Sequence, residues 1–174
     1  MRIIEEQMKY SLKIATRSSI IQFENEDRRE WVLKHPTQVI LSVDAIYWTK
    51  IAEEQYLQSD NGEGEDVGTL DEYCYKIIMD LEEITELIRG DLSMINRRIL
   101  VALVTQDVHY RDIIQQLYED GVTKQSDFAW VQQLKFYWEE EMFFAKQVGS
   151  RLYYGYEYLG ALSRLVIVIF KYCY

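Results

Sequence analysis

The chain has 174 residues, of which 48% are hydrophobic, and this length and composition suit one ordinary globular domain rather than a disordered chain. Its formal net charge of −10 at pH 7 repels phosphate backbones and anionic lipid surfaces. We therefore expect no nucleic acid and no membrane among its partners. A single proline and eight glycines leave few helix breakers, which favours long helices.

The two cysteines, Cys74 and Cys173, stand too far apart for a metal-binding or redox motif. We expect two reduced thiols in an intracellular protein. The opening stretch becomes charged at Glu5 and Glu6, so no signal peptide is expected. No apolar run reaches the roughly 18 residues of a membrane-spanning helix, and a cytoplasmic location is expected.

Three helices are predicted in the first third of the chain. Apolar residues recur at helical spacing over 1–21, in a helix that begins without a capping residue, as if it were cut from a longer one. Residues 25–27 can start a short helix that carries Trp31 and Leu33, and Pro36 ends it, because the residue before a proline avoids the helical region. A third helix should start at Pro36 and fade near Ser59, before an exposed acidic loop at 60–66. Its apolar side carries Val39, Ile40, Val43, Ile46, Tyr47 and Ile51.

The middle of the chain predicts an antiparallel pair of long helices. Thr69 and Glu72 form a capping-box pattern before the apolar stripe Leu70, Tyr73, Cys74, Ile77, Leu81, Ile84 and Ile88. Gly90 stands where a left-handed residue would end that helix. Ser93 can cap the next helix, which Gly121 ends, and the short connection implies antiparallel packing.

The last third changes from helical to strand periodicity. Residues 126–127 can cap a shorter helix that carries Phe128, Val131, Leu134 and Trp138. Apolar or aromatic residues then occupy every even position of 151–158, which is typical of a strand. Met142–Gln147 can pair with this strand through a turn at 148–150, and 165–170 is one more extended apolar segment.

These elements predict a mainly α fold, an elongated helical bundle of about five or six helices with a small C-terminal aromatic β-hairpin. The helical segment is expected over 1–140 and the hairpin junction over 141–164.

Residues 107–112 hold the one cluster in the sequence that mixes histidine with carboxylates. Asp107 and Arg111 are i, i+4 neighbours on a helix and can form an ion pair, while His109 and Asp112 are i, i+3 neighbours. A metal site would need further ligands from elsewhere, so helix surface pairing is the better interpretation, and no metal is expected.

The carboxylates at 139–141 could serve acid–base chemistry, but such a charge run is usually solvated and no nucleophile lies nearby in the sequence. The sequence has no Gly-rich phosphate loop and no G-x-S-x-G or H-E-x-x-H motif. We therefore expect no catalytic residue and no cofactor in the chain itself, and no ATPase activity from the chain alone.

Five aromatic residues, Trp130, Trp138, Tyr154, Tyr156 and Tyr158, have two interpretations. They could form a core beneath the hairpin, or they could be a docking face for a neighbouring domain. Periodicity does not separate these alternatives.

Several motifs resemble the dynein heavy chains, in that family's order and approximate spacing. The most specific are FAWVQQLKFYW at 128–138 and YGYEYLG at 154–160. The others are WVLKHPTQVIL at 31–41, IYWT at 46–49, DVHYRD at 107–112 and RLVI at 164–167. The resemblance covers 31–165, and the motifs look closer to axonemal than to cytoplasmic members.

The resemblance implies a mechanical role. In this family a similar aromatic block closes a helical linker, a lever that spans the AAA+ ring and shifts between bent and straight states as ATP is bound and hydrolysed. By resemblance, the coupling joint between lever and ring would be formed by Trp130, Trp138, Tyr154, Tyr156 and Tyr158.

The resemblance also implies that 165–174 starts the first AAA+ module, with Leu165, Val166 and Ile167 near the ATP base. Residues 168–172 depart from the family pattern, because they are one residue shorter and lack its Thr-Pro turn. The phosphate-binding lysine, the stalk and the microtubule-binding domain are expected outside this chain.

For the parent motor the resemblance implies ATP and Mg²⁺ as cofactors. The implied partners are the AAA+ ring of the same heavy chain, dynein intermediate and light intermediate chains, and microtubules. The implied location is the cytoskeleton, in the axoneme of cilia. The rival interpretation is a free-standing helical adaptor that binds a partner protein through an apolar groove, and a small enzyme using His109 is a remote third.

Overall fold

The computed structural model describes residues 2–58 and 68–159 of the chain. Helices fill most of it, and strands appear only towards its end. The helices are α1 (Arg2–Asn25), α2 (Arg28–Trp31), α3 (Thr37–Ile51), the π-helical turn η1 (Ala52–Tyr56), α4 (Leu70–Arg89), α5 (Met94–Glu119) and α6 (Phe128–Val131). The strands are β1 (Lys135–Glu139), β2 (Met142–Gln147) and β3 (Ser150–Tyr153).

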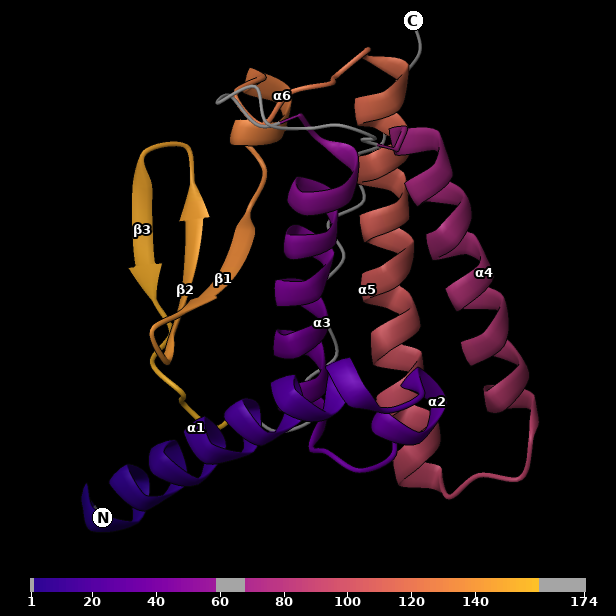
Figure 1. The fold of residues 1–174 in the computed structure, drawn as a ribbon. Helices are drawn as coiled ribbons and strands as arrows, with labels where there is room; N and C mark the ends of the chain where they lie inside the picture. Colours follow the sequence, from indigo (N-terminus) through magenta and orange to yellow (C-terminus); the bar gives the residue numbers. More distant parts are fainter. Residues whose placement is uncertain (1, 59–67, 160–174) are drawn as a thin grey trace, which may run out of the picture.

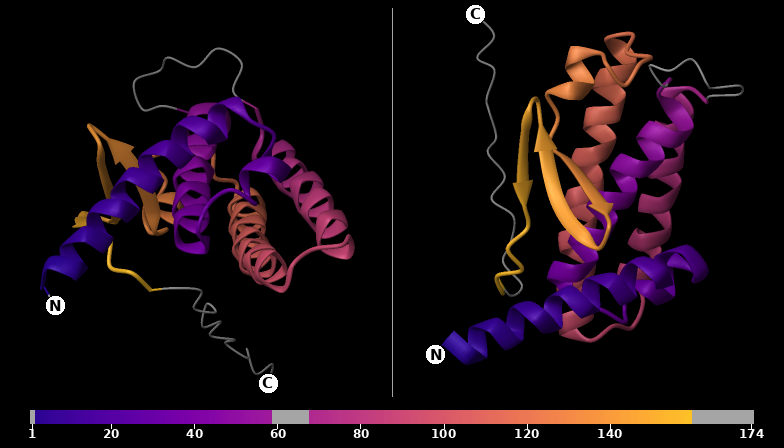
Figure 2. Two further views of the ribbon diagram at one scale, coloured as in Figure 1. Left: turned by 90° about the horizontal axis from the view of Figure 1, so that it is seen from below. Right: turned by 60° about the vertical axis from the view of Figure 1, so that its left-hand side comes forward.

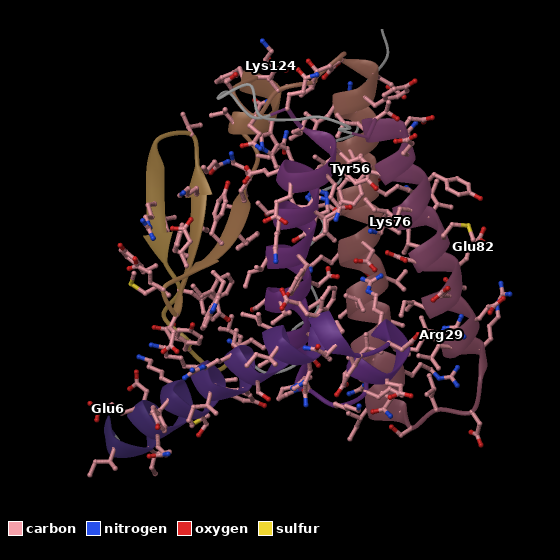
Figure 3. The ribbon with its side chains drawn as sticks, viewed as in Figure 1. Glu6, Arg29, Tyr56, Lys76, Glu82 and Lys124 are labelled. Atoms are coloured by element: carbon pink, nitrogen blue, oxygen red, sulfur yellow. The ribbon has the colours of Figure 1, made fainter. Side chains whose placement is uncertain are left out.

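Three long helices, α3, α4 and α5, form the body of the molecule, and α5 packs against both of the others (Figure 1). Helices α4 and α5 run antiparallel, as predicted. Helix α1 crosses one end of this body, and its N-terminal half projects beyond it (Figure 2). Glu6 lies on the projecting half (Figure 3), where Ile3 and Tyr10 are exposed. A helical bundle that carries a small sheet confirms the predicted fold class.

Local sequence signals set the ends of the long helices. Thr69 Oγ1 accepts the Glu72 N–H at 3.3 Å and Glu72 Oε2 accepts the Thr69 N–H at 2.8 Å, which completes the predicted capping box. Ser93 caps α5, and Gly121, with φ of +72°, follows its end. The prediction for Gly90 is wrong: its backbone is extended, with φ of −72°, and its N–H reaches the Leu87 carbonyl without a left-handed turn.

Helix α1 is longer than predicted and ends at Asn25. Its last turn is held by Phe23, whose ring stacks on Tyr47 at a centroid distance of 4.0 Å and meets Trp31 edge-on at 4.8 Å. Such long-range aromatic packing extends a helix beyond what its own sequence favours. Asp27 then caps the short helix α2 by accepting the Arg29 N–H. A short second helix is therefore present as predicted, but it ends at Trp31 rather than at Pro36.

Two clusters of buried side chains form the core, and α3 contributes to both. In one, Trp48 stacks on Tyr110 at 4.3 Å and also meets Trp130. In the other, Trp31 and Ile40 are fully buried. Helix α3 is buried over most of its length and packs against α1, α5 and β1, whereas α4 takes its position from α5.

The prediction of one helix over 128–138 is wrong, because helical structure stops at Val131 and Lys135–Glu139 is β1. The expected helical stripe is not a buried set, since Phe128 and Leu134 are both exposed. Three consecutive aromatic residues at 136–138 hid the strand period. All three are half-buried, so β1 is partly covered on both faces rather than on one.

The sheet is antiparallel in the order β1-β2-β3, with Trp138 opposite Phe143 and Ala145 opposite Leu152. The predicted pairing of β2 with the following strand is confirmed. That strand ends at Tyr153 rather than at Tyr158, because the chain turns back towards α3. The sheet stands beside α3 with β1 as its nearest strand (Figure 1).

The turn between β1 and β2 holds two glutamates in the left-handed region, Glu140 with φ of 48° and Glu141 with φ of 62°. Two-residue hairpin turns of this kind favour Asn-Gly. We expect Glu140→Asn combined with Glu141→Gly to raise the free energy of unfolding by about 1–2 kcal/mol, measured by urea denaturation. The exposed Glu141–Arg17 ion pair that is lost contributes little. A lower urea midpoint in the double variant would contradict this reading of the turn.

The acidic loop at 60–66, the apolar segment at 165–170 and Cys173 lie outside the described residues. Cys74 is a buried free thiol. Across 2–58 and 68–159, no helix combines the length and apolar character that crossing a membrane requires.

Candidate functional site

The junction between α3 and the sheet begins with a hydrogen bond from strand backbone to helix side chain. The Phe136 N–H of β1 donates to Thr49 Oγ1 at 3.0 Å, and the Thr49 hydroxyl donates to the Ala45 carbonyl at 3.1 Å. Thr49 is fully buried. A hydroxyl that donates and accepts at once satisfies both the Phe136 N–H and the Ala45 carbonyl away from water. This bond therefore fixes the position of β1 along α3.

Glu53 collects three side chains of the α6–β1 region. Its Oε1 accepts from Trp130 Nε1 at 3.0 Å and from the Tyr137 hydroxyl at 2.8 Å, and Lys135 Nζ lies 3.5 Å away. Hydrogen bonds to a carboxylate are stronger than neutral ones. Burial, and then the nearby Glu53 carboxylate, raise the pKa of Tyr137, so its hydroxyl stays a donor at neutral pH.

Glu53 owes its position to the wide turn η1. The Leu57 N–H donates to the Ala52 carbonyl at 3.0 Å, which is the i to i+5 spacing of a π-helix. Single π turns inside helices are frequent at functional sites. Gln125 bonds the Glu53 carbonyl at 2.7 Å, so the loop between α5 and α6 is fastened to the same turn.

At the opposite end of α3, Gln38 binds the segment 154–159 that follows β3. Gln38 Nε2 donates to the Tyr154 hydroxyl and to the Glu157 carbonyl, each at 2.6 Å. Gln38 Oε1 accepts the Leu159 N–H at 3.0 Å. The chain after the sheet thereby returns to the first turn of α3, at the end of the body that α1 crosses (Figure 1).

Aromatic packing supports the same segment. The Tyr154 ring lies 4.5 Å from Phe143 and meets Tyr156 edge-on at 5.0 Å. Tyr156 has φ of 51°, a left-handed conformation that is rare for a bulky residue, and it packs against the core cluster around Trp31. Burial, and then the neighbouring Tyr154, raise the pKa of Tyr156 to about 12.

The structure does not bring the five predicted joint residues together at one place. Trp130 is fully buried near Glu53, and Trp138 is half-buried on β1 opposite Phe143. Tyr154 and Tyr156 lie together near Gln38, whereas Tyr158 is 60% exposed. The set is therefore partly core and partly surface, and its role as a coupling joint stays a prediction.

The predicted contacts of Leu165, Val166 and Ile167 with an ATP base lie outside the described residues, as does the divergent stretch 168–172.

A buried charge cluster holds α2, α3 and α5 together. One Arg28 nitrogen, Nη2, bonds Asp44 Oδ1 at 2.7 Å and Asp107 Oδ2 at 2.9 Å, while Nη1 lies 3.8 Å from Asp80 of α4. Gln106 donates to Asp44 Oδ2 at 2.9 Å and to the Leu41 carbonyl. The set Arg28, Asp44, Asp80, Gln106 and Asp107 is called the Arg28 cluster below.

The predicted ion pair between Asp107 and Arg111 is therefore wrong. Asp107 is 4% exposed and turns inward to Arg28, while Arg111 bonds its neighbour Asp112 at 2.6 Å. Spacing along one helix gives the neighbours that are available, but burial decides which is used, because a buried carboxylate needs a close cation.

Asp107→Asn tests the pH dependence of this cluster. Burial, and then Asp44, raise the pKa of Asp107 well above its usual range, although Arg28 opposes them. The folded protein therefore holds this proton more tightly than the unfolded chain does. The stability that protonation of Asp107 contributes is present below the unfolded pKa of about 4. It is lost as pH rises through the raised pKa of the folded protein.

We expect urea denaturation of Asp107→Asn to show a smaller loss of stability between about pH 4 and pH 7 than the unaltered chain shows. Asp112→Asn is the matched control, since Asp112 is exposed on the same helix. An unchanged pH profile for Asp107→Asn would contradict the raised pKa.

Across the described ranges, no group of three His, Cys, Asp or Glu side chains could hold a metal ion. Among the carboxylates at 139–141, Glu139 lies 3.8 Å from Lys146 and 3.6 Å from Arg151, and Glu141 lies 2.8 Å from Arg17. These are ion pairs between surface residues.

A groove of about 350 Å³ lies between α3, α5 and the sheet. Its lining is mixed: Leu41, Ala45, Ile113, Leu134 and Phe143 are apolar, while Ser42, Gln106, His109, Gln132, Gln133 and Gln147 are polar. The adaptor interpretation calls for an apolar groove, and this lining is only partly apolar.

Sequence reasoning missed Thr49, Glu53, Gln38 and Arg28. Thr49, Glu53 and Arg28 each have at least one partner more than 70 positions away in sequence, and Gln38 has partners more than 110 positions away. A periodicity argument has no access to such pairs. Gln38 stands within the motif at 31–41 and Thr49 within the motif at 46–49, and these motifs were the available signals.

No model of a protein family matches the chain. It is 38% identical over 164 residues to dynein axonemal heavy chain 12 of Mus musculus. It is 34% identical over 164 residues to dynein axonemal heavy chain 3 of Mus musculus, and 32% identical over 168 residues to dynein axonemal heavy chain 1 of Homo sapiens.

These matches cover 94% to 96% of the chain but only 4% or 5% of each relative. The similarity runs through the helical body, the sheet and segment 154–159 alike, since so little of the chain is left unmatched. The chain therefore belongs to the dynein heavy-chain family, in which it corresponds to one short segment of a far longer polypeptide.

Proposed function

We propose that the chain is a mechanical linker, or lever, segment of an axonemal dynein heavy chain, which couples the states of an ATPase ring to force. The observation that carries the proposal is the match over at least 94% of the chain to axonemal dynein heavy chains. The fastening of the sheet to both ends of α3, through Glu53 and Gln38, supports it, because a lever must transmit load without yielding internally.

In this proposal the intact motor uses ATP and Mg²⁺ in its ring, and the segment's first partner is that ring in the same heavy chain. Microtubules and the intermediate and light intermediate chains are partners through the whole motor, which works on the cytoskeleton of the axoneme. Contact of Leu165, Val166 and Ile167 with an ATP base belongs to the same proposal. A free-standing adaptor is not favoured, because the relatives are motor heavy chains.

The lever role predicts that a change in this segment can weaken force production without weakening nucleotide binding. In an intact heavy chain, Trp138→Ala and Tyr156→Ala should lower the velocity of microtubule gliding while the affinity for ATP persists. Trp138 packs on the sheet and Tyr156 packs on the helical core, so each truncation loosens the junction without touching a phosphate site. Gliding velocity and nucleotide titration measure the two effects.

Tyr75→Ala is the matched control, since Tyr75 is 65% exposed on α4, away from the junction. It should leave velocity unchanged. Wild-type gliding by both Trp138→Ala and Tyr156→Ala would show that these aromatics do not form a coupling joint.

A further inference from the structure

The Gln38 side chain joins parts of the chain that are about 120 positions apart in sequence. Its primary amide has two N–H donors and one carbonyl acceptor, and each of these three groups forms a hydrogen bond. The two N–H groups serve the Tyr154 hydroxyl and the Glu157 carbonyl, and the oxygen serves the Leu159 N–H.

This arrangement resembles the edge of a neighbouring strand. Gln38 offers an acceptor and a donor to Leu159 and Glu157, two residues apart, as strand backbone would. The last bond of the segment to the sheet is the Tyr154 N–H to the Phe143 carbonyl, at 2.9 Å. Beyond that point Gln38 takes over from the sheet as the partner of the backbone.

Tyr156 fixes the path of the chain between the sheet bond at Tyr154 and the contacts with Gln38. Its left-handed backbone turns the chain, and its ring packs on the core cluster around Trp31. The segment is thus held at three successive points: by the sheet at Tyr154, by the core at Tyr156 and by Gln38 at 157–159.

We propose that Gln38 is the positioning residue that sets the path of segment 154–159 along the helical body. This rests on the proposed lever function, in which the segment leads from the body towards the ring. A side chain on the first turn of α3, the most buried helix, transmits the position of the body directly to that backbone.

Amide hydrogen exchange, followed by NMR on this chain, tests the proposal. In Gln38→Met, which keeps the length of the side chain and removes its hydrogen bonds, the Leu159 amide should exchange at least about tenfold faster. Amides of α4 and β2 should keep their protection. In Gln38→Glu the carboxylate still accepts from Leu159, so that amide should be largely rescued, although the Glu157 carbonyl loses its donor.

Two controls separate positioning from general destabilisation. Tyr154→Phe removes one contact of Gln38 and leaves both backbone contacts, so Leu159 should stay protected. Gln115→Met changes an exposed glutamine on α5 whose amide bonds Glu119, and it should alter nothing in the segment.

Unchanged exchange at Leu159 in Gln38→Met would overturn the proposal. Equal loss of protection across α4, β2 and the segment would also overturn it, because Gln38 would then be a general structural residue. The experiment needs neither ATP nor microtubules, so a failure of the lever function in gliding assays would remain distinguishable from a failure of this contact.

Discussion

Arg28→Met should lower the free energy of unfolding by about 3–5 kcal/mol, because Asp44 and Asp107 would stay buried without their cation. Burial already opposes ionisation of Asp107, and Arg28 is the group that favours its charged form. The loss should be smaller at low pH, where protonation removes the uncompensated charge. Urea denaturation at about pH 7 and about pH 4 measures both effects.

Arg29→Met provides a control one position away. Arg29 lies beside α4 (Figure 3), and its Nε is 3.3 Å from Glu83, with about half of each side chain exposed. Such surface pairs contribute about 0–1 kcal/mol. Equal losses for Arg28→Met and Arg29→Met would show that the Arg28 cluster does not hold the helices together.

Trp130→Ala should cost about 3–5 kcal/mol, the usual loss for a fully buried tryptophan. The indole fills the core beside Trp48 and donates to Glu53, so truncation opens a cavity and removes a donor from a part-buried carboxylate. Trp130→Phe keeps most of the volume and should cost less. Thermal and urea unfolding, with near-ultraviolet circular dichroism to follow aromatic packing, measure the series.

Phe128→Ala is the control from the same short helix, because Phe128 is 69% exposed. It should shift stability by no more than about 0.5 kcal/mol. If Trp130→Ala unfolds at the same urea concentration as Phe128→Ala, the α6 region is not part of the core and the junction at Glu53 is weak.

The parts of the fold that could be predicted are those whose cause is local. The capping box of Thr69 and Glu72 and the cap at Ser93 lie within four residues of the helix starts that they define. The pairing of β2 with β3 depends on a two-residue turn. Each of these signals is read within one or two turns of chain, so sequence alone suffices.

The errors fall where distant packing decides. Residues 128–138 carry a helical stripe, yet β1 forms because its backbone and Tyr137 find partners at Thr49 and Glu53. Asp107 leaves its helical neighbour for Arg28 on another helix. The strand predicted to reach 158 stops early, since Gln38 replaces the sheet as the partner of the backbone.

The aromatic residues of the candidate site could be identified by type and position, but not their division between two ends of α3. That division depends on the sheet standing beside the helix with one edge towards it, a tertiary relation that no spacing encodes. The polar groups that complete each end are Thr49, Glu53 and Gln38; Thr49 and Gln38 stand in family motifs, but the motifs do not show which distant groups these side chains bind.

Contacts at both ends of α3 join the helix and the sheet into a closed circuit. The circuit runs along α3 to Glu53, across to β1, through the three strands and back along segment 154–159 to Gln38. A bend at the wide turn η1 would have to change the distance between Glu53 and Gln38. The sheet therefore acts as a brace, and α3 can flex there only if the contacts of Glu53 or those of Gln38 first separate.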